Sequence, residues 1–345
     1  MPSVTADIAA NDLVQETLRE WLAGRGVFTT FERAPDGRKI LYASTRPGKV
    51  QDFLLNAHTD VVAAPSEMFR PVERDGWLCG RGTGDCKGNA VLVACVLAEL
   101  VGRASVGAVF SSDEEAGGTS AETMVQLGYA ARKLVVVLDS QPEKVCVAEK
   151  GHVYFTVRAR GRSCHSSRPW EGDNAAQRLL AAWTRLAEIM PRDASEGDQW
   201  HDTMSVTVLR AGDAPNRVPD VAELVVNLRY VERGGADVWQ RRIEEATGLE
   251  VERGEHSLPV EVSASEPIVE RFRTFLRASL PGREVPVTKT CGATDARSFV
   301  KLGVPLVISS ADKRGDHGAD EAVRLASLDE YAAAISGFIL SESGE

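Results

Sequence analysis

The chain has 345 residues, of which 26% are charged and 43% are hydrophobic, and its formal net charge is −10. This is the composition of a globular protein, and the length predicts two domains. The acidic balance argues against nucleic acid or an anionic membrane as the main partner, because both attract basic proteins. No apolar run approaches the roughly 18 residues that a membrane span needs.

The cysteines and the first residues indicate where the protein resides. The six cysteines include no Cys-x-x-Cys pair, and a chain of this length does not need disulfides for its stability. The first residues, Met-Pro-Ser-Val-Thr, have neither a basic start nor an apolar stretch, so no signal peptide is visible. We therefore expect reduced thiols and a cytoplasmic location.

The first part of the chain alternates between helices and strands. An amphipathic helix is predicted over residues 9–23, with Leu13, Leu18, Trp21 and Leu22 on its apolar side. There follow, in chain order, strands at 27–32, 38–44 and 52–58, a helix at 89–101, a strand at 105–111, a helix at 119–127 and a strand at 133–139. This alternation favours a largely parallel sheet with helices on both faces.

The pattern changes after about residue 150 and returns after about residue 263. In between we expect a half-exposed strand at 152–160, a helix at 173–188, strands at 203–210 and 221–230, a helix at 235–246 and a strand at 249–254. The last part predicts helices at 266–279, 294–301 and 327–340 and strands at 285–289 and 304–309. We predict one α/β domain, residues 1–150 and 263–345, interrupted by an inserted α+β domain, residues 151–262.

Acidic and imidazole side chains follow the ends of several apolar strands and one Gly-rich loop. In chain order these residues are His58, Asp60, Asp85, Glu114, Glu115, Asp139, Asp316 and His317. Taken singly, a histidine is more often structural, and an aspartate after a strand is often a helix N-cap. Their common placement favours a shared site, because ligands of open α/β sheets bind at the carboxyl ends of the strands.

So many carboxylates can share one site only if a cation neutralises them, since like charges otherwise raise their pKa values steeply. Histidine and carboxylate ligands suit zinc, and also cobalt or manganese. Two metals roughly 3.5–4 Å apart, bridged by one carboxylate, would use such a set economically. The residues therefore predict a centre of two divalent ions at one edge of the sheet.

Seven blocks of the sequence carry a resemblance to a known family. They are Asn-Ala-His-Thr-Asp-Val-Val (56–62), Gly-Arg-Gly-Thr-Gly-Asp-Cys-Lys-Gly (80–88), Ser-Asp-Glu-Glu-Ala-Gly-Gly (112–118), Gly-Arg-Ser-Cys-His-Ser-Ser-Arg-Pro (161–169), Ala-Pro-Asn-Arg-Val-Pro-Asp (214–220), Cys-Gly-Ala-Thr-Asp-Ala-Arg (291–297) and His-Gly-Ala-Asp-Glu (317–321). In these blocks the chain resembles the zinc amidohydrolases and metallopeptidases that include acetylornithine deacetylase, succinyl-diaminopimelate desuccinylase and glutamate carboxypeptidase. The resemblance covers essentially the whole chain, and the first three blocks are the most specific.

The resemblance implies a zinc-peptidase-like catalytic domain and a ferredoxin-like inserted domain that serves as a lid and forms a homodimer. It also implies the ligands of two zinc ions. His58, Asp85 and Asp139 would hold one ion. Asp85, Glu115 and His317 would hold the other, so that Asp85 bridges the pair.

The resemblance assigns further roles around the metals. Asp60 would accept a hydrogen bond from His58 and orient its ring. Glu114 would be the general base, taking a proton from a metal-bridging water and passing it to the leaving amine. The family pattern also predicts a cis peptide bond between Asp85 and Cys86.

Substrate contacts are implied in the same way. His165 would reach the partner's active site and stabilise the developing oxyanion. Asn216 and Arg229 would bind polar groups of the substrate, including its α-carboxylate, and Gly292 and Thr294 would line the pocket. A surface-loop histidine and an ordinary strand-end arginine are the plainer interpretations of His165 and Arg229.

Some residues depart from the family pattern. Asp139 stands where deacetylases and desuccinylases usually have Glu, and Asp is more typical of aminopeptidases and tripeptidases. Cys86 replaces a common Met and is interpreted as a packing residue, and Asn89 replaces a common Gly. Lys313 and Arg314 add two cations beside His317. A solvated loop is the simpler interpretation of that pair, and recognition of an acidic end of the substrate is the functional one.

The function predicted from these residues is hydrolysis of the amide bond of a small N-acyl-amino acid, as in deacetylases and desuccinylases. The alternative is a dipeptidase or carboxypeptidase that acts on short peptides, which Asp139 favours. A binding protein without activity is a third hypothesis. It is disfavoured because Glu114 and every metal-ligand position carry competent residue types.

Overall fold

The computed structural model describes residues 1–142, 144–191, 199–280 and 282–344. The chain divides into two compact units, and the second is inserted into the first. The first unit comprises Met1–Ala148, Glu261–Thr290 and Thr294–Glu345, and the second comprises Glu149–Val260 and Cys291–Ala293. Every helix among the described residues is too short or too polar to span a bilayer.

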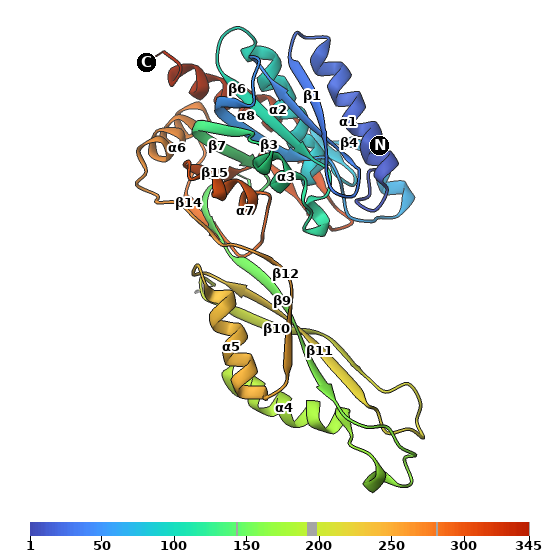
Figure 1. Cartoon of the computed structure of the whole chain (residues 1–345). Helices are drawn as coiled ribbons and strands as arrows, with labels where there is room; N and C mark the ends of the chain where they lie inside the picture. The colour runs from blue at the N-terminus through green and yellow to red at the C-terminus, as the bar shows by residue number, and fades with distance from the viewer. Residues whose placement is uncertain (143, 192–198, 281, 345) are drawn as a thin grey trace. The chain divides into compact units, whose positions relative to one another are not determined.

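The first unit is built on a sheet of nine strands within the described residues, with a parallel centre and antiparallel edges (Figure 1). The strands lie in the order β1 (Phe28–Arg33), β2 (Lys39–Ser44), β6 (Val106–Ser111), β3 (Val50–His58), β7 (Ala130–Leu138), β15 (Leu306–Ser309), β8 (Val145–Glu149) and β13 (Val260–Glu261), and β14 (Val287–Thr290) pairs with β8. β3 runs parallel to β6 and β7, and β7 runs parallel to β15. The loops that follow these four strands therefore begin at one edge of the sheet.

Helices bury both faces of this sheet. They are α1 (Ile8–Ala23), α2 (Gly88–Leu100), α3 (Ser120–Gln126), α6 (Pro267–Ser279), α7 (Ala296–Phe299) and α8 (Leu325–Ser341). Phe53 and Leu55 of β3 belong to the core that α2 and α8 cover. Leu54 and Asn56 point the other way and are buried as well, and Asn56 lies 3.4 Å from Asp295 at the start of α7. Burial on both faces explains why this segment reads as a continuous apolar run.

A small antiparallel sheet joins two loops that are distant in the sequence. Its strands lie in the order β16 (Lys313–Arg314), β17 (Ala322–Arg324), β5 (Trp77–Cys79) and β4 (Val72–Arg74). The backbone amide of Gly80 donates to the carbonyl of Glu321 at 2.9 Å, so the Gly-rich loop lies beside the segment that carries His317. The sequence did not predict this sheet, because strands of two or three residues are too short to show an alternation.

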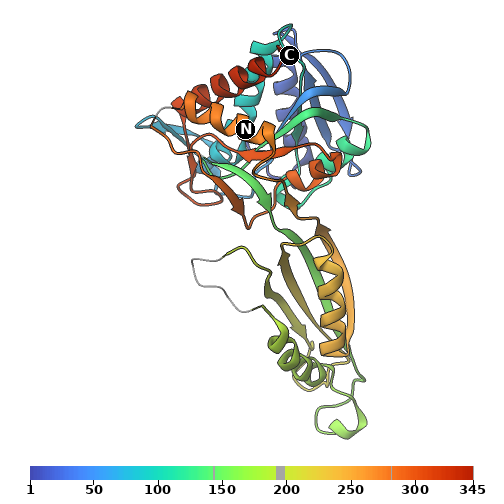
Figure 2. The ribbon, with the colours of Figure 1, turned by 90° about the vertical axis from the view of Figure 1, so that its left-hand side faces the viewer.

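The second unit is an antiparallel sheet with two helices, α4 (Ala175–Ile189) and α5 (Gly235–Thr247), on one face (Figure 2). Its strands lie in the order β10 (Thr203–Ala211), β11 (Val221–Tyr230), β9 (Gly151–Arg160) and β12 (Glu250–Ser257). Val153, Phe155 and Val157 of β9 face the helices, whereas Tyr154 and Thr156 lie half-buried on the open face. This one-sided burial produces the alternation from which the strand was predicted.

The predicted fold class is confirmed: a mixed α/β sheet with helices on both faces, interrupted by an α+β insertion. Each predicted helix and strand is found, with ends that differ by a few residues. The predicted helix at 294–301 is α7 continued by a short 3₁₀ turn at Val300–Leu302.

Candidate metal centre and active site

The loops at the carboxyl edge of the sheet bring the candidate ligands together. His58, the last residue of β3, places Nε2 3.0 Å from Oδ1 of Asp85 and 3.8 Å from Oδ2 of Asp139. The other oxygen of Asp85, Oδ2, lies 3.2 Å from Nε2 of His317, which lies 2.9 Å from Oε2 of Glu115. Asp85 thus presents one carboxylate oxygen to each histidine, and the predicted ligands form one continuous cluster.

The donor atoms are close enough to share an ion. His58, Asp85 and Glu115 each offer a ligand atom, and these atoms lie within 4.8 Å of one another. Among the described residues, Oε1 of Glu115 is buried and has no hydrogen-bond partner. A buried carboxylate oxygen without a partner is unfavourable unless a cation compensates it. The residues present therefore fit a divalent metal centre.

Electrostatics support the same conclusion. Burial raises the pKa of Glu115 to about 7, with Asp85 adding to the effect and His58 opposing it. Burial also raises the pKa of Asp139, and the charge of Asp85 adds to that rise. Bound cations would stabilise the ionised forms of Glu115 and Asp139, so both carboxyls would lose their protons to solvent when metal binds.

The pKa values of Asp85 and His317 are shifted in opposite directions. Burial alone would raise the pKa of Asp85, but hydrogen bonds with His317 and His58 and the charge of Lys313 lower it well below its ordinary range. The hydrogen bond to Asp85 and the charge of Glu115 raise the pKa of His317 to about 9, although burial opposes them. Asp85 is thus ionised between cationic groups, the state in which it would bind metal.

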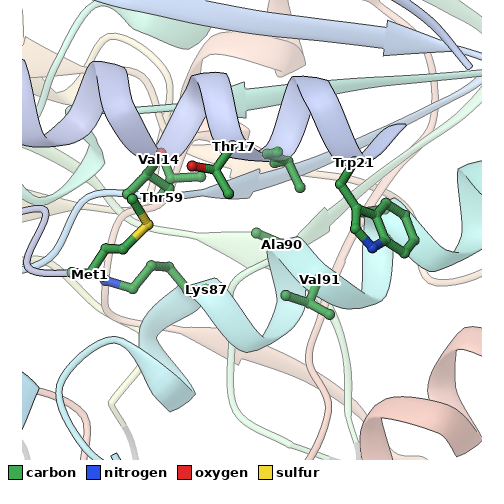
Figure 3. A pocket seen from close by; sticks show the side chains of 10 residues that line it. Met1, Val14, Thr17, Trp21, Thr59, Lys87, Ala90 and Val91 are labelled. Carbon is green, nitrogen blue, oxygen red and sulfur yellow. Dashed lines mark hydrogen bonds between the residues drawn. The ribbon is translucent and has the colours of Figure 1, made fainter. Parts of the chain in front are cut away.

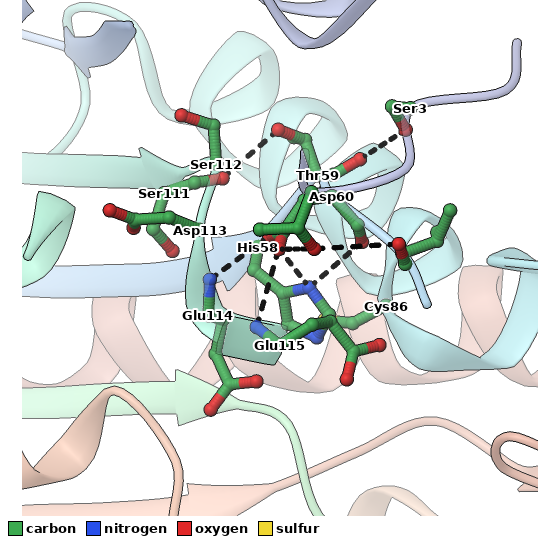
Figure 4. A network of polar contacts seen from close by, with 12 residues as sticks. Ser3, His58, Thr59, Asp60, Cys86, Ser111, Ser112, Asp113, Glu114 and Glu115 are labelled. Atoms are coloured by element: carbon green, nitrogen blue, oxygen red, sulfur yellow. Dashed lines mark hydrogen bonds and ion pairs between the residues drawn. The ribbon is translucent and has the colours of Figure 1, made fainter. Parts of the chain in front are cut away.

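Asp60 links the ring of His58 to the turn that carries the candidate base (Figure 4). Nδ1 of His58 lies 3.1 Å from the backbone carbonyl oxygen of Asp60 and 3.3 Å from its Oδ1. The amides of Glu114 and Glu115 donate to the two oxygens of Asp60 at 3.1 and 3.2 Å, and the hydroxyl of Thr5 donates at 2.8 Å. Asp60 is fully buried, so this one carboxylate orients a ligand and the neighbouring turn together.

A buried ion pair, which the sequence reasoning missed, positions the other two loops. Oε1 of Glu321 accepts from the amides of Gly84 at 3.1 Å and Asp85 at 3.0 Å. Its Oε2 pairs with Arg81, whose guanidinium donates to the carbonyl of His317 at 2.9 Å. His317 adopts the left-handed region, at φ 62°, which is uncommon for a residue with a side chain. Both residues stand inside the quoted blocks, but the pairing spans the chain and has no local signal.

Glu114, the candidate base, lies beside Arg297. Its Oε1 is 3.3 Å from Nη1 of Arg297, and its side chain is only 10% exposed. Burial raises the pKa of Glu114 well above its ordinary value, with Asp139 adding to the effect and His58 and Arg297 opposing it. The block at 291–297 was expected to line the pocket through Gly292 and Thr294. The structure shows that Arg297 from this block contacts Glu114, and sequence reasoning missed that contact.

The structure assigns Gly292 and Thr294 to different units. Gly292 is exposed and belongs to the second unit, whereas Thr294 is buried in the first. The hydroxyl of Thr294 accepts a hydrogen bond of 3.2 Å from the amide of Ala296 at the start of α7. Contact of these two residues with substrate stays a prediction.

The other predicted substrate residues lie in the second unit. His165 is exposed, and its Nδ1 accepts from the amide of Ser167 at 3.2 Å. The carbonyl of Asn216 accepts from the amide of Ser166 at 2.9 Å, so Asn216 and His165 are neighbours. Arg229 lies on the open face of the sheet, near the other end of β11. Within this unit, the structure does not bring Arg229 to His165.

The structure shows the predicted cis bond and the surroundings of two departures from the family pattern, Cys86 and Asn89. The peptide bond between Asp85 and Cys86 is cis, which confirms that prediction. Cys86 is fully buried, and its thiol donates to the carbonyl of Leu138 at 3.0 Å and lies among donor atoms of His58 and Asp139, so its role as a packing residue stays a prediction. Asn89 donates to the hydroxyl of Ser310 at 2.9 Å, so it ties α2 to the loop after β15.

Lys313 and Arg314 differ in their exposure to solvent. The solvated-loop interpretation is wrong for Lys313, because its side chain is 3% exposed and its ammonium lies among carboxylates of the cluster. Arg314 is exposed, and its guanidinium lies 4.4 Å from the centre of the Trp77 ring. A two-residue strand explains the difference, because successive side chains point to opposite faces.

The first unit also contains an apolar pocket of about 280 Å³ between α1 and α2 (Figure 3). Residues that line it include Met1, Val14, Trp21, Ala90 and Val91. None of the predicted metal ligands or catalytic residues lines it, so it is a separate feature from the cluster.

Histidines and carboxylates gathered at the carboxyl edge of a mixed sheet are the arrangement expected of a metallohydrolase. Residues 54–341 match Peptidase family M20/M25/M40, and the chain belongs to this family. The family resemblance found in the sequence is therefore confirmed, and the protein is a hydrolase of this family.

Relatives of known name are similar over different lengths. The chain is 29% identical to a succinyl-diaminopimelate desuccinylase of Cereibacter sphaeroides over an alignment that covers 96% of this chain and 93% of that one. It is 31% identical to a probable carboxypeptidase of Aspergillus clavatus, with 56% and 52% covered. It is 32% identical to an acetylornithine deacetylase of Myxococcus xanthus, with 51% and 49% covered. The chain thus matches about half the length of the last two relatives.

Solved structures share the fold. A metallo-carboxypeptidase of the M20 family from Sulfolobus solfataricus superposes with a TM-score of 0.79 at 15% identity, covering 98% of this chain and 96% of that chain. A dinuclear metal-binding peptidase of the same family from Bacillus subtilis superposes with a TM-score of 0.69 at 13% identity, covering 96% and 92%. At these identities the likeness shows the fold alone.

Proposed function

We propose that the protein is a two-zinc hydrolase that cleaves the amide bond of small N-acyl-amino acids. The main support for the metal centre is the placement of Asp85, which presents one carboxylate oxygen to His58 and the other to His317. This is the geometry required of a carboxylate that bridges two ions. His58 and Asp139 would complete one side, and Glu115 and His317 would complete the other.

When bound, two divalent ions would polarise the scissile carbonyl and lower the pKa of the attacking water. Glu114 would accept the proton of that water and deliver it to the nitrogen of the leaving amine. Its buried position and raised pKa suit a group that must both take and release a proton near neutral pH. Asp60 would hold the ring of His58 and the turn that carries Glu114 in fixed positions during this transfer.

The substrate class rests on the relatives. Succinyl-diaminopimelate desuccinylase matches nearly the full length of the chain, and acetylornithine deacetylase matches half of it. Short peptides form the second candidate class, because Asp139 and the similarity to a carboxypeptidase both favour them. The two classes differ in what the pocket must accept on the acyl side of the bond.

We further propose that the inserted unit acts as a lid and forms a homodimer. His165 lies beside Arg217 at one end of the sheet, and Arg229 pairs in register with His152 near the other end. The intervening length of β11 is roughly 25 Å at about 3.3 Å per residue. Two such distant side chains of one chain are too far apart to contact one small substrate. In a dimer, His165 of one subunit and Arg229 of the other can serve the same site.

A substrate screen tests the proposal. Purified protein is stripped of metal, reloaded with zinc, cobalt or manganese, and assayed on N-acetyl- and N-succinyl-amino acids and on dipeptides. The proposal expects two bound ions per chain and cleavage of acylated amino acids in preference to dipeptides. Preferential cleavage of dipeptides would select the second candidate, and a folded protein that binds no metal would overturn the metal centre.

A further inference from the structure

Lys313 places a buried ammonium inside the cluster of candidate ligands. Its Nζ lies 3.0 Å from Asp316, 3.6 Å from Oδ1 of Asp139 and 3.8 Å from Oδ1 of Asp85. Its side chain is 3% exposed, so water screens these charges little. A lysine is seldom buried to this degree unless it is paired.

The charge of Lys313 acts on one side of the cluster. Oδ1 of Asp85, which Lys313 faces, is also the oxygen that lies 3.0 Å from His58. The opposite oxygen, Oδ2, faces His317. Lys313 therefore stands at the edge formed by His58, Asp85 and Asp139, and the Glu115–His317 edge lies on the other side of the bridging carboxylate.

The surrounding backbone holds the lysine in this place. β16 pairs with β17, with Lys313 opposite Val323. A Cβ atom added to Gly84 would lie 3.2 Å from Cβ of Lys313, so the absence of a side chain at Gly84 lets the lysine stem pass close to the Gly-rich loop. Just upstream, the amide of Ala311 donates to Asn89 at 3.2 Å, which anchors the loop to α2. The strand pairing and these neighbouring contacts therefore fix the position of the ammonium.

We propose that Lys313 is an internal counter-cation that makes the two metal positions unequal and sets the order in which they fill. This inference rests on the proposed two-ion centre. In the metal-free protein the ammonium partly neutralises Asp85 and Asp139. When metal binds, the same charge repels an ion at the His58–Asp139 edge more than an ion at the Glu115–His317 edge, because repulsion falls with distance. The Glu115–His317 edge therefore fills first, and the other ion binds more weakly.

Lys313→Met tests this inference, because methionine keeps much of the length of the side chain and removes its charge. Chelated protein is titrated with Zn²⁺ against a chromophoric competitor, and with Co²⁺ followed by its visible absorption. Wild type is expected to bind two ions in separate steps. Lys313→Met should tighten the weaker step by about tenfold or more and bring the two steps together.

Arg314→Met is the matched control, since it removes the same charge from the next residue, outside the cluster. Its binding steps should stay within about twofold of wild type. Thermal unfolding of the chelated proteins gives a second measurement. Without metal, Lys313→Met should unfold at a lower temperature than wild type and Arg314→Met, because Asp85 and Asp139 lose their counter-cation. Lys313→Gln is the second neutral variant if the methionine variant does not fold.

The outcomes separate the two proposals. The inference would be overturned if the weaker ion bound with the same affinity to wild type and to the neutral Lys313 variants. It would also be overturned if Arg314→Met tightened that step as much as Lys313→Met. Either result would leave the proposed hydrolase intact. Conversely, a protein whose second step responds to Lys313→Met but which cleaves no acylated amino acid or dipeptide would support the inference and overturn the proposed function.

Discussion

The backbone amide of Asp85 donates a hydrogen bond of 3.0 Å to Oε1 of Glu321, although 236 positions separate the two residues. Through this contact, and through Arg81, the last sequence block holds both the bridging carboxylate and the loop of His317. The candidate metal centre is thus positioned by a buried ion pair that does not itself belong to the ligand set.

Removal of this pair should lower stability strongly. Glu321→Ala leaves Arg81 buried without its carboxylate, and we expect a loss of about 3–5 kcal/mol in the free energy of unfolding. Glu99→Ala, in the exposed pair with Arg103, is the control and should lose no more than about 1 kcal/mol. Urea denaturation of the chelated proteins measures both. A loss at Glu321 no larger than that at Glu99 would show that the buried pair does not stabilise the fold.

Neighbouring glutamates should respond differently to the same substitution. Glu114→Gln is expected to lower kcat by about 10²–10⁴-fold while metal content is unchanged, because it removes a proton acceptor but no ligand. Glu115→Gln should lower the affinity for one of the two ions, because it weakens a ligand. Steady-state kinetics and metal analysis by mass spectrometry separate the two effects. Loss of metal from Glu114→Gln would reassign that residue as a ligand.

Mixed dimers should reveal whether His165 acts across subunits. His165→Ala and Glu114→Gln are each expected to be nearly inactive alone. When equal amounts are mixed and allowed to exchange subunits, about a quarter of wild-type activity should return, because one site in each mixed dimer has both residues intact. Exchange is confirmed by native mass spectrometry. Exchange without recovery of activity would place His165 and Glu114 in the same subunit's site, and an active His165→Ala variant would exclude His165 from it.

Metal should stabilise the folded state. Zinc at about 100 times its dissociation constant is expected to add about 2.7 kcal/mol to the free energy of unfolding, because the ligands converge only in the folded chain. Thermal unfolding with and without a chelator measures this effect. Asp85→Asn should lose most of it, since Asp85 faces both histidines. An equal response in Asp85→Asn would place the binding site elsewhere.

The sequence predicted the convergence of His58 and Asp139 because each follows a strand in the parallel centre of the sheet. Neighbouring parallel strands end at the same edge, so position along the chain translates directly into position in space. The cis bond after Asp85 was also predicted, but from the family resemblance and not from a local physical signal. The inserted unit was visible because its strands are buried on one face and alternate accordingly.

The contacts of Arg81, Arg297 and Lys313 could not be predicted in this way. The Arg81–Glu321 pair joins opposite ends of the chain, and the Arg297–Glu114 pair joins loops from different parts of it. Lys313 and Arg314 read alike as two adjacent cations, and only the pairing of β16 with β17 decides which of them points inward. Burial of a charged residue depends on these tertiary neighbours and leaves no periodic pattern in the sequence.

The candidate ligands and the base all belong to the first unit, whereas His165, Asn216 and Arg229 belong to the inserted one. The proposed chemistry and the proposed substrate contacts of these three residues therefore lie on separate stretches of the polypeptide, and each stretch has its own hydrophobic core. If these proposed roles are right, substitutions between residues 149 and 260 would change which amide is accepted and leave the candidate metal-binding loops unchanged. Such a division offers a physical reason why one architecture serves desuccinylases, deacetylases and peptidases alike.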